Sequence, residues 1–365
     1  MSLRQGVGRV AVSHKGNRWY VHFHYRTPAG QRKKKWVGGF LTEEEARAAE
    51  AGVRAEWDTR TVGGYLNQWV ASRLEDGRIR PSTGQNYRRM VRKHVTPTLG
   101  KALLAEVGPE HIEHLYQQLR GKGLGNTSLN RIHAVLKTAF AECRALGGTN
   151  VVAQLRPPKA DRFEPTTWTP EQVSEFLDWA EWNDPKWQAF WYMAALTGAR
   201  KGELCGFRAE DIDLDQGTAR VVRTVLELED GVSLGPPKTP RSARTLELPG
   251  VAVEKVREHI KRGDMAGDDW LFAARDRLGP TRPSVMSRRF SRNQARMGTL
   301  PRIRFHDLRH SFCTNAAEAG VRPEVLQKMV GHSNITTTLG YYVHVRDEAK
   351  RSASEVVAAA VFGHQ

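Results

Sequence analysis

The stretch HDLRHSFCTNAAEAG, residues 306–320, predicts a helix with a basic polar face. His306 and Arg309 are three residues apart, so their side chains share one face of a helix. The helix should stop at Gly320, because glycine readily adopts the left-handed backbone conformation that follows many helices. The two side chains are therefore candidate functional residues of one site.

A zinc site is the competing interpretation of the same stretch. His306 and His310 have the spacing of the HExxH helix of zinc proteases. However, Asp307 stands where that motif has glutamate, and Arg309 would place a positive charge beside the metal ion. We therefore expect no metal ion at these histidines.

The next polar stretch, LQKMVGHSNITTTLGYYVHV at residues 326–345, predicts two helices joined by a short turn. Gly331 should end the first helix, and His332 should lie in the turn. A Ser-Asn pair is suited to cap the second helix. That helix carries Tyr341 and Tyr342 about two and a half turns later. Each tyrosine alone could simply pack in a core.

An earlier stretch, TGARKGELCGFRAEDIDLD at residues 197–215, predicts a tight turn between two helices. One helix should end at Thr197–Gly198, and the next should start near Arg200. An arginine fixed by such a turn can present its forked guanidinium to a phosphate. Glu203 lies one helical turn further and could orient Arg200, although such a pair is often only a surface ion pair.

Residues 235–249, GPPKTPRSARTLELP, place Lys238 in a proline-rich turn between two strands. The strands are expected at 218–228 and 242–249. A lysine on such a turn can reach into a cleft and donate a proton, but by itself the residue would usually be only an exposed lysine.

The composition indicates a polyanionic partner. The 365 residues suffice for two or three domains, and 39% hydrophobic residues suffice for ordinary cores. The 56 Lys and Arg residues outnumber the 40 Asp and Glu residues, which leaves a net charge of +16. Charge alone separates neither DNA from RNA nor nucleic acid from an acidic membrane surface, and a solvated basic face would look the same.

The cysteines and the apolar residues point to a reducing cytosol. Cys143, Cys205 and Cys313 are far apart and form no CxxC pair, so neither a disulfide framework nor a zinc ribbon is expected. The first residues lack the apolar core of a signal peptide. No run of about 18 apolar residues could span a membrane.

The N-terminal region predicts a basic three-stranded sheet followed by one helix. It contains no Asp or Glu before Glu43, and its apolar and polar residues alternate over 19–26 with the period of a strand. Another strand should cover 32–40, and Thr42 with Glu45 forms a capping-box pattern that opens a helix to about Trp57. Such a sheet can lie in a DNA groove. The alternative is a basic tail that aids solubility.

The candidate DNA contacts of this region are basic residues of its expected strands: Arg18, Arg32, Lys33, Lys34 and Lys35. His22 and His24 share a strand face, but no further ligand stands nearby, so we expect surface residues rather than metal ligands.

Residues 61–150 have apolar positions at helical spacing throughout, with breaks at glycines and prolines. One of the expected helices carries a basic cluster that could contact phosphates or form a solvated face: Arg88, Arg89, Arg92 and Lys93. The proline-containing segment 151–168 is expected to be an extended linker. A third region, 169–350, opens with Thr169 as a helix N-cap and continues with mixed helices and strands.

Together, the four polar stretches resemble the active-site motifs of the tyrosine recombinases, the phage-type integrases. The resemblance covers roughly residues 165–346 and rests on TGARKGEL, the turn lysine before SARTLELP, HDLRHSF, and GHSN followed by YVH. It implies a multidomain, mainly α fold with small β-sheets (α+β). The parts would be an arm-type DNA-binding domain at 1–58, a helical core-binding (SAM-like) domain at 61–150 and a mixed α/β catalytic domain at 169–350.

The resemblance also implies a role for each basic residue. Arg200 and Arg309 would clamp the non-bridging oxygens of the scissile phosphate, and His332 would donate a further hydrogen bond. Lys238 would be the general acid for the leaving 5′-oxygen, and His306 would assist proton movement or bind phosphate. Because the covalent intermediate stores the bond energy, the family needs neither a cofactor nor a metal ion.

The tyrosine that attacks phosphorus is one of two. Some family members place it nine residues after the histidine that matches His332, which gives Tyr341 as the alternative. Others have one more residue and a Tyr-x-His ending, which gives Tyr342 followed by Val343 and His344. The second pattern fits the local sequence better, so we expect Tyr342 to form the 3′-phosphotyrosine.

The expected activity is site-specific recombination, which integrates a phage or another mobile element at its attachment sites. Its expected partners are double-stranded core and arm DNA, a homotetramer on that DNA, an excision or directionality factor and a host DNA-bending protein, with no membrane. The expected location is the bacterial cytosol, with the nucleoid. The tail 351–365 could dock on its own domain or on a neighbouring subunit. The other functional hypotheses are a relaxing topoisomerase and a non-catalytic DNA-binding regulator.

Overall fold

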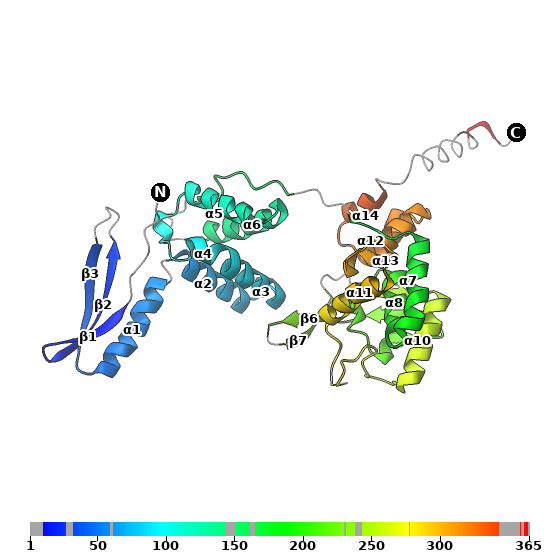
Figure 1. Ribbon diagram of the computed structural model, residues 1–365, viewed down its shortest axis with the longest axis horizontal. Coiled ribbons are helices and arrows are strands. Elements are labelled where there is room, and N and C mark those ends of the chain that lie inside the picture. Colours follow the sequence, from blue (N-terminus) through cyan, green and yellow to red (C-terminus); the bar gives the residue numbers. More distant parts are fainter. Residues whose placement is uncertain are drawn as a thin grey trace. The chain divides into compact units, whose positions relative to one another are not determined.

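The computed structural model describes residues 10–26, 32–58, 61–143, 150–160, 165–229, 231–237, 243–276, 278–342, 358 and 361–363. Residues 1–163 and 164–365 form two compact units, which we treat separately (Figure 1). Among the described helices, none combines the length and apolar character that crossing a bilayer would require.

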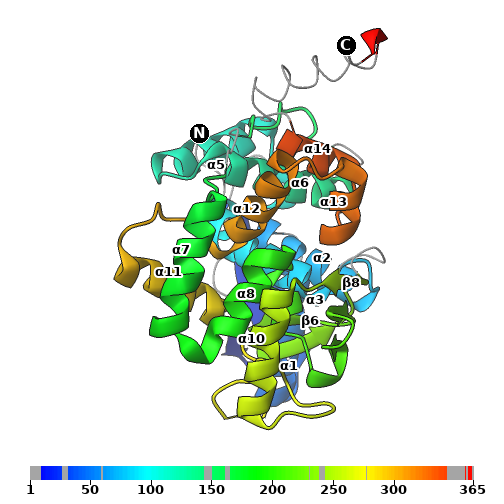
Figure 2. The ribbon, with the colours of Figure 1, turned by 90° about the vertical axis from the view of Figure 1, so that its right-hand side faces the viewer.

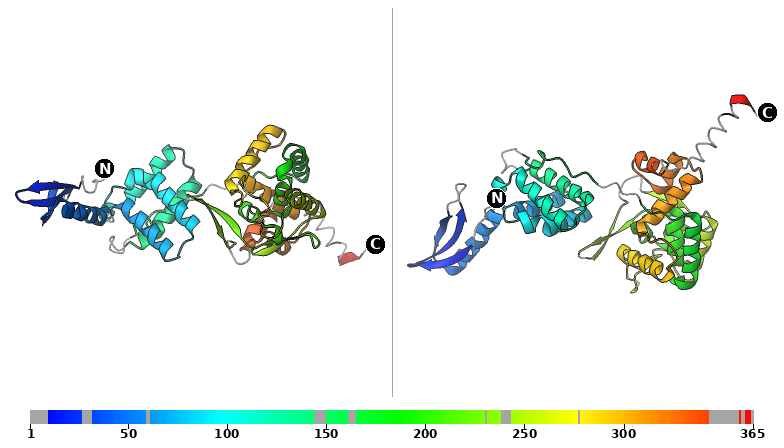
Figure 3. Two further views of the ribbon diagram at one scale, coloured as in Figure 1. Left: turned by 90° about the horizontal axis from the view of Figure 1, so that it is seen from below. Right: turned by 45° about the horizontal axis from the view of Figure 1, so that its top comes forward.

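A three-stranded antiparallel sheet opens the first unit, as predicted. The strands β1 (Ala11–Lys15), β2 (Arg18–Arg26) and β3 (Arg32–Phe40) lie in that order, and α1 (Glu43–Asp58) covers one face (Figure 3). Val21 and Phe23 are fully buried on this face because alternate residues of a strand point the same way. The predicted capping box is confirmed, since Thr42 Oγ1 accepts from the Glu45 amide and the Glu45 carboxylate accepts from the Thr42 amide.

The rest of the first unit is helical and has its own core. The elements are α2 (Val62–Glu75), α3 (Pro81–Met90), a π-helical turn η1 (Val91–Val95), α4 (Thr96–Leu99), η2 (Leu104–Glu106), α5 (Pro109–Gly121) and α6 (Asn126–Ala141). Leu66, Leu115 and Leu136 are among its fully buried residues. None of these core residues belongs to the cluster beneath the N-terminal sheet.

The segment expected to be an extended linker, 151–168, contributes to two cores instead. Val151 and Val152 are buried against the helices of the first unit, and the Asn130 side chain donates to the Pro158 carbonyl. Trp168 is fully buried in the second unit. Apolar side chains at both ends of the segment explain the difference, because prolines restrict a chain without keeping its other residues in solvent.

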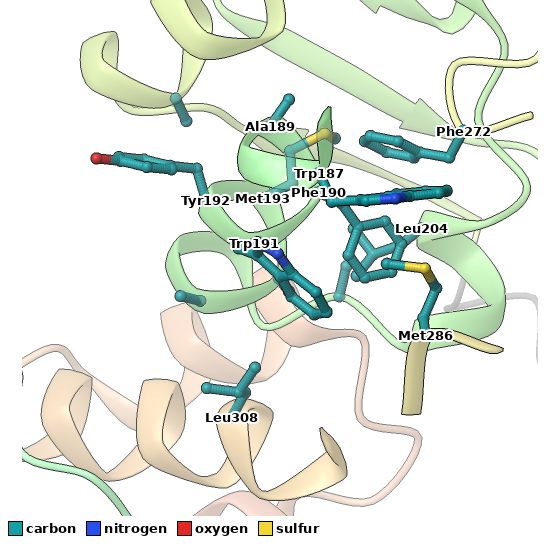
Figure 4. Packing of buried hydrophobic residues seen from close by; sticks show 14 of the residues in the cluster. Trp187, Ala189, Phe190, Trp191, Tyr192, Met193, Leu204, Phe272, Met286 and Leu308 are labelled. Atoms are coloured by element: carbon teal, nitrogen blue, oxygen red, sulfur yellow. The ribbon is translucent and has the colours of Figure 1, made fainter. Parts of the chain in front are cut away.

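The second unit is a mixed α/β structure whose helices enclose α8 (Figure 2). Its helices are α7 (Pro170–Asn183), η4 (Pro185–Trp187), α8 (Gln188–Thr197), α9 (Lys201–Leu204), η5 (Ala209–Asp211), α10 (Gly250–Gly263), α11 (Pro283–Met297), α12 (Phe305–Glu318), α13 (Pro323–Val330) and α14 (Ile335–Tyr342). Nearly every residue of α8 is buried, as expected for a helix that is apolar on all sides. Its aromatic residues Phe190 and Trp191 pack in a large cluster with Phe272 and other apolar side chains (Figure 4).

The strands of this unit differ from the prediction of one long strand at 218–228. The chain there forms β5 (Thr218–Val221) and β6 (Thr224–Leu228), which belong to different sheets. β5 lies between β4 (Ile212–Asp213) and β8 (Arg244–Glu247), whereas β6 forms a hairpin with β7 (Gly231–Gly235) that extends beyond the helices (Figure 3). The break falls at Arg223, whose guanidinium pairs with the buried carboxylate of Asp211.

Candidate active site

The turn between α8 and α9 is built as the sequence predicts. α8 ends at Thr197, and Gly198 adopts φ +60°, the left-handed conformation that suits glycine. A Cβ on Gly198 would come within 2.6 Å of the Phe312 ring, so the position has no room for a side chain. Arg309 Nη1 donates to the Gly198 carbonyl at 2.7 Å, which ties this turn to α12.

Glu203 orients Arg200 through two hydrogen bonds. The Arg200 amide donates to Oε2 at 2.9 Å, and Arg200 Nη1 donates to Oε1 at 2.8 Å. Glu203 is only 3% exposed, and burial alone would raise the pKa of its carboxyl; Arg244 and Arg200 outweigh that effect and hold this pKa below its usual value. The Arg200 side chain is 30% exposed, in contrast to the buried side chains of Glu203 and Arg309.

Arg309 and Arg200 both contact the end of α13. Arg309 Nη2 donates to the Val330 carbonyl at 2.8 Å, and Arg200 Nη2 donates to the Gly331 carbonyl at 3.2 Å. Arg309 is buried, and burial together with nearby Arg200 lowers its pKa to about 10, so it stays charged at neutral pH. His332 follows directly in the chain, and the arrangement therefore brings three of the predicted residues together.

His332 is a buried neutral imidazole. Its Nδ1 lies 3.0 Å from Oγ1 of the fully buried Thr338, and the Tyr341 ring stacks on it at 6.2 Å between centroids. Burial, then Arg309 and Arg200, lower its pKa to about 4. Burial also lowers the pKa of His306, although part of its side chain is exposed; His310 and Arg309 act in the same direction.

The structure separates the two tyrosines. The Tyr341 hydroxyl lies 2.6 Å from His310 Nδ1, and burial raises the pKa of this phenol. Tyr342, the nucleophile favoured by the sequence, donates instead to the Val321 carbonyl. Neighbouring residues of a helix point about 100° apart, so α14 cannot present both side chains to one site. In this conformation Tyr341 lies in the site and Tyr342 does not.

Sequence reasoning missed Arg244, although a signal was present. In ARTLEL, Arg244 shares its strand face with Leu246 and Leu248, which are both buried. An arginine on the buried face of a strand requires a partner, and that partner is Glu203. Sequence reasoning also missed Thr338, the last of three consecutive threonines, because nothing in that run distinguishes it from its neighbours.

Several other predicted residues lie outside this cluster. Lys238 falls outside the described residues, and so do the side chains of Arg32 and Lys33. Lys34 and Lys35 are exposed on the N-terminal sheet, where Lys34 lies 3.9 Å above the Trp36 ring. Arg18 donates to the Gly39 carbonyl across the sheet.

The basic cluster of the helical region lies partly beside a groove. The four predicted residues are all exposed, on α3 and η1: Arg88, Arg89, Arg92 and Lys93. Arg89 and Lys93 line a groove of about 720 Å³ between these elements and α6, which adds Arg131. Three basic side chains from three elements therefore line one groove.

The described residues contain no group of three His, Cys, Asp or Glu side chains that could hold a metal ion. His306 and His310 lie edge to face at 5.1 Å between ring centroids, and His310 is engaged by Tyr341. Among the described residues, therefore, no third ligand stands beside His306 and His310 to support a zinc site in the HDLRH stretch.

Three family models match the chain. The model described as phage integrase family matches residues 167–349, the arm DNA-binding domain matches 11–56, and the phage integrase N-terminal SAM-like domain matches 61–120. The prophage phiRv2 integrase of Mycobacterium tuberculosis is 27% identical over 292 residues, which cover 76% of this chain and 73% of that protein.

Solved structures of DNA-bound integrases are similar to the chain. The Tn1549 transposon integrase in complex with circular intermediate DNA is 25% identical with a TM-score of 0.68, over 80% of this chain and 99% of that one. Lambda integrase, solved as a tetramer bound to a Holliday junction, is 20% identical with a TM-score of 0.56, over 89% and 96%.

The neutral state of His332 predicts a loss of stability in acid. In the unfolded chain this histidine takes up a proton near its ordinary pKa of 6.5, whereas in the fold it does so only near 4. The unfolded state therefore binds more protons between these values, and the free energy of unfolding falls as pH falls through this window. From pH 7 to pH 5 the contribution is about 2 kcal/mol.

Urea unfolding of the wild-type protein and of His332→Gln at both pH values measures this effect. The variant should lose less stability on acidification, because glutamine cannot take up the proton. An equal loss in the two proteins would show that His332 is not held neutral by the fold.

Proposed function

Because this chain belongs to the phage integrase family, it is a tyrosine-type site-specific recombinase that breaks and rejoins DNA, and we propose that the cluster around Arg200 and Arg309 is its active site. The observation that carries the proposal is the convergence of two guanidiniums from distant segments on the turn that bears His332. A phosphodiester carries one negative charge, and the transition state of its cleavage spreads more charge onto the non-bridging oxygens.

Arg200 and Arg309 clamp these oxygens, and Glu203 orients Arg200. Both guanidiniums are held before DNA arrives, so little reorganisation is needed as the charge develops. With Nδ1 accepting from the Thr338 hydroxyl, the proton of neutral His332 resides on Nε2 and can be donated to phosphate. Its low pKa supports this role, because the imidazole then keeps the same protonation state throughout the neutral range.

The covalent step exchanges one phosphate ester for another. The phenolic oxygen forms a bond to phosphorus, and the bond from phosphorus to the 5′-oxygen breaks. Lys238 gives its proton to the departing oxygen, and His306 assists the removal of the phenolic proton or binds the phosphate. The product is a 3′-phosphotyrosine with a free 5′-hydroxyl, and no cofactor takes part because the ester bond is conserved.

Tyr342 is the nucleophile that the Tyr-x-His pattern supports, with Tyr341 as the alternative. For Tyr342 to attack, its bond to the Val321 carbonyl must break and α14 must turn by about 100°, the angle between neighbouring residues. The contacts of Tyr341 with His310 and His332 support the alternative. In the Tyr342 mechanism, Tyr341 holds the two histidines until DNA binds.

The remaining parts of the chain bind DNA around this centre. Residues 1–58 bind arm sites through the exposed basic side chains of their sheet, such as Lys34 and Lys35, and the groove lined by Arg89, Lys93 and Arg131 holds the backbone of the core site. The working assembly is a homotetramer in the bacterial cytosol, associated with the nucleoid. It integrates a phage or another mobile element, with the help of a directionality factor and a host bending protein. The tail 351–365 docks on a neighbouring subunit of that assembly.

The nucleophile is tested by removing one hydroxyl at a time. On a nicked duplex that carries the attachment-site core, Tyr342→Phe should form no covalent adduct, whereas Tyr341→Phe should still form it. Both variants should bind the duplex like the wild type, because neither loses a charge. Denaturing gels of the adducts provide the measurement. Adduct formed by Tyr342→Phe and absent from Tyr341→Phe would assign the reaction to Tyr341.

The arm-binding proposal is tested by a truncation that starts at Thr61. This residue is the N-cap of α2, accepting from the Gly64 amide, so the cut leaves the helical core intact. The truncated protein should keep its affinity for core DNA and lose binding to arm DNA. The salt dependence of arm binding by the full-length protein should steepen by about 0.9 in log–log slope for each phosphate contact. Gel shifts over a salt series measure both; equal binding of both DNAs by both proteins would favour the solubility tail.

A further inference from the structure

We propose that Arg244 is a positioning residue for strand cleavage, which acts on Arg200 and His332 through Glu203 and the end of α13. The inference rests on the proposed active site and adds a residue that the family resemblance did not supply. Arg244 stands on β8, and its side chain is only 7% exposed. All three nitrogens of its guanidinium are engaged by Glu203 and the Met329 carbonyl, so we assign it to positioning and not to the phosphate.

The first contact of Arg244 is a forked pair with Glu203. Arg244 Nη2 donates to Oε2 at 3.0 Å, and Nη1 donates to Oε1 at 3.3 Å. These are the two oxygens that also accept from the amide and the guanidinium of Arg200. One carboxylate is thus shared by two arginines, and neither arginine has it alone.

The second contact joins Arg244 to the turn that carries His332. Three successive carbonyls at the end of α13 each accept from a different arginine: Met329 from Arg244 Nε at 2.9 Å, Val330 from Arg309 Nη2 at 2.8 Å and Gly331 from Arg200 Nη2 at 3.2 Å. The last carbonyls of a helix have no partner within it and carry partial negative charge, so they are suitable acceptors for cations. Arg244 therefore fixes the start of the same turn that Arg200 fixes at its end.

The shared carboxylate affects how strongly Arg200 can bind a phosphate. Without Arg244, the ion pair with Arg200 would be the one left to the buried charge of Glu203 among the described residues, and the carboxylate would hold that guanidinium more tightly. A guanidinium held by a carboxylate is a weaker clamp for phosphate, because the two anions compete for the same donors. Arg244 thus balances Glu203 and leaves Arg200 directed by it but able to bind DNA.

The matched control is Arg223, which has the same chemistry beside the turn that follows α9 but bonds to Asp211, Glu210 and Gly206 rather than to the Glu203 carboxylate or the end of α13. Its guanidinium pairs with the buried carboxylate of Asp211 and donates to the Gly206 carbonyl. Arg223→Met and Arg244→Met each remove one arginine from one buried carboxylate within the same unit. A difference in cleavage rate between the two variants therefore reports on position relative to the site rather than on the loss of a buried ion pair.

The test measures the initial rate of covalent adduct formation on nicked core DNA, core-site affinity by gel shift, and folding by circular dichroism. Arg244→Met should cleave about 10²-fold more slowly than the wild type, the cost of a small misplacement of catalytic groups, with core affinity little changed. Arg223→Met should melt at a lower temperature and cleave at nearly the wild-type rate. Arg244→Lys should stay well below the wild-type rate, because an ammonium cannot reproduce the fork.

A double variant separates positioning from simple structural support. Glu203→Gln combined with Arg244→Met removes both the carboxylate and its balancing charge, so it should cleave faster than Arg244→Met alone. Because residues in contact couple whatever their role, the comparison is made on folded protein, where a purely structural pair predicts that the double variant regains thermal stability over Arg244→Met but not cleavage rate. If Arg244→Met does not fold, Arg244→Lys and the double variant, which leaves no unpaired buried charge, provide the decision.

Wild-type cleavage by folded Arg244→Met overturns the inference, and so does an equal rate loss in Arg223→Met or a double variant that regains thermal stability but not cleavage rate. If the wild-type protein itself forms no adduct on this DNA, the proposed active site fails. This result is distinguishable from the other three, in all of which the wild-type protein forms the adduct.

Discussion

The site depends on one constraint: a buried carboxylate must be neutralised where three guanidiniums meet the end of a helix. Glu203 is almost fully enclosed, and a charge in such a place is tolerated only with partners of opposite sign. Arg200 and Arg244 supply the positive charge that pairs with Glu203. Arg309 extends from α12 to the end of α13, which both of the other arginines also contact. The cluster carries three positive charges and one negative charge, so it has an excess of positive charge that a phosphodiester can neutralise.

The large aromatic core explains why this cluster keeps its geometry without DNA. α8 is packed on all sides by apolar side chains (Figure 4). Its last residue, Thr197, lies three positions before Arg200. Arg309 bonds to the carbonyl of Gly198, at the end of α8, and to that of Val330, at the end of α13. Movement of any one of these elements would break several charged hydrogen bonds together. The arginines are therefore held in place without DNA, as the proposed clamp on the scissile phosphate requires.

Much of this site could be predicted because its residues lie in short motifs with local structural causes. The glycine after α8, the glycine after α13 and the capping residues are turn signals, and they place Arg200 and His332 where they are found. Arg244 required a different step, namely noticing a charge on the apolar face of a strand. The break between β5 and β6 falls at Arg223, and its pairing with Asp211 joins positions that no local pattern connects.

The choice between the two tyrosines marks the limit of sequence reasoning. Tyr341 and Tyr342 have the same side chain, and only the rotation of α14 decides which one faces the arginines. That rotation is set by tertiary contacts, here with His310 and with the Val321 carbonyl. The family pattern and the observed contacts favour different residues, and the proposed rotation of α14 on DNA binding would reconcile them.

The structure of the full-length protein bound to a nicked attachment-site duplex tests the central claim most directly. The distances to be measured are those between the scissile phosphate and the guanidiniums of Arg200 and Arg309. The account predicts that both arginines donate to its non-bridging oxygens at about 2.7–2.9 Å, with Glu203 still bonded to Arg200. A scissile phosphate bound elsewhere, with Arg309 bonded only to the carbonyls of Gly198 and Val330, would contradict it.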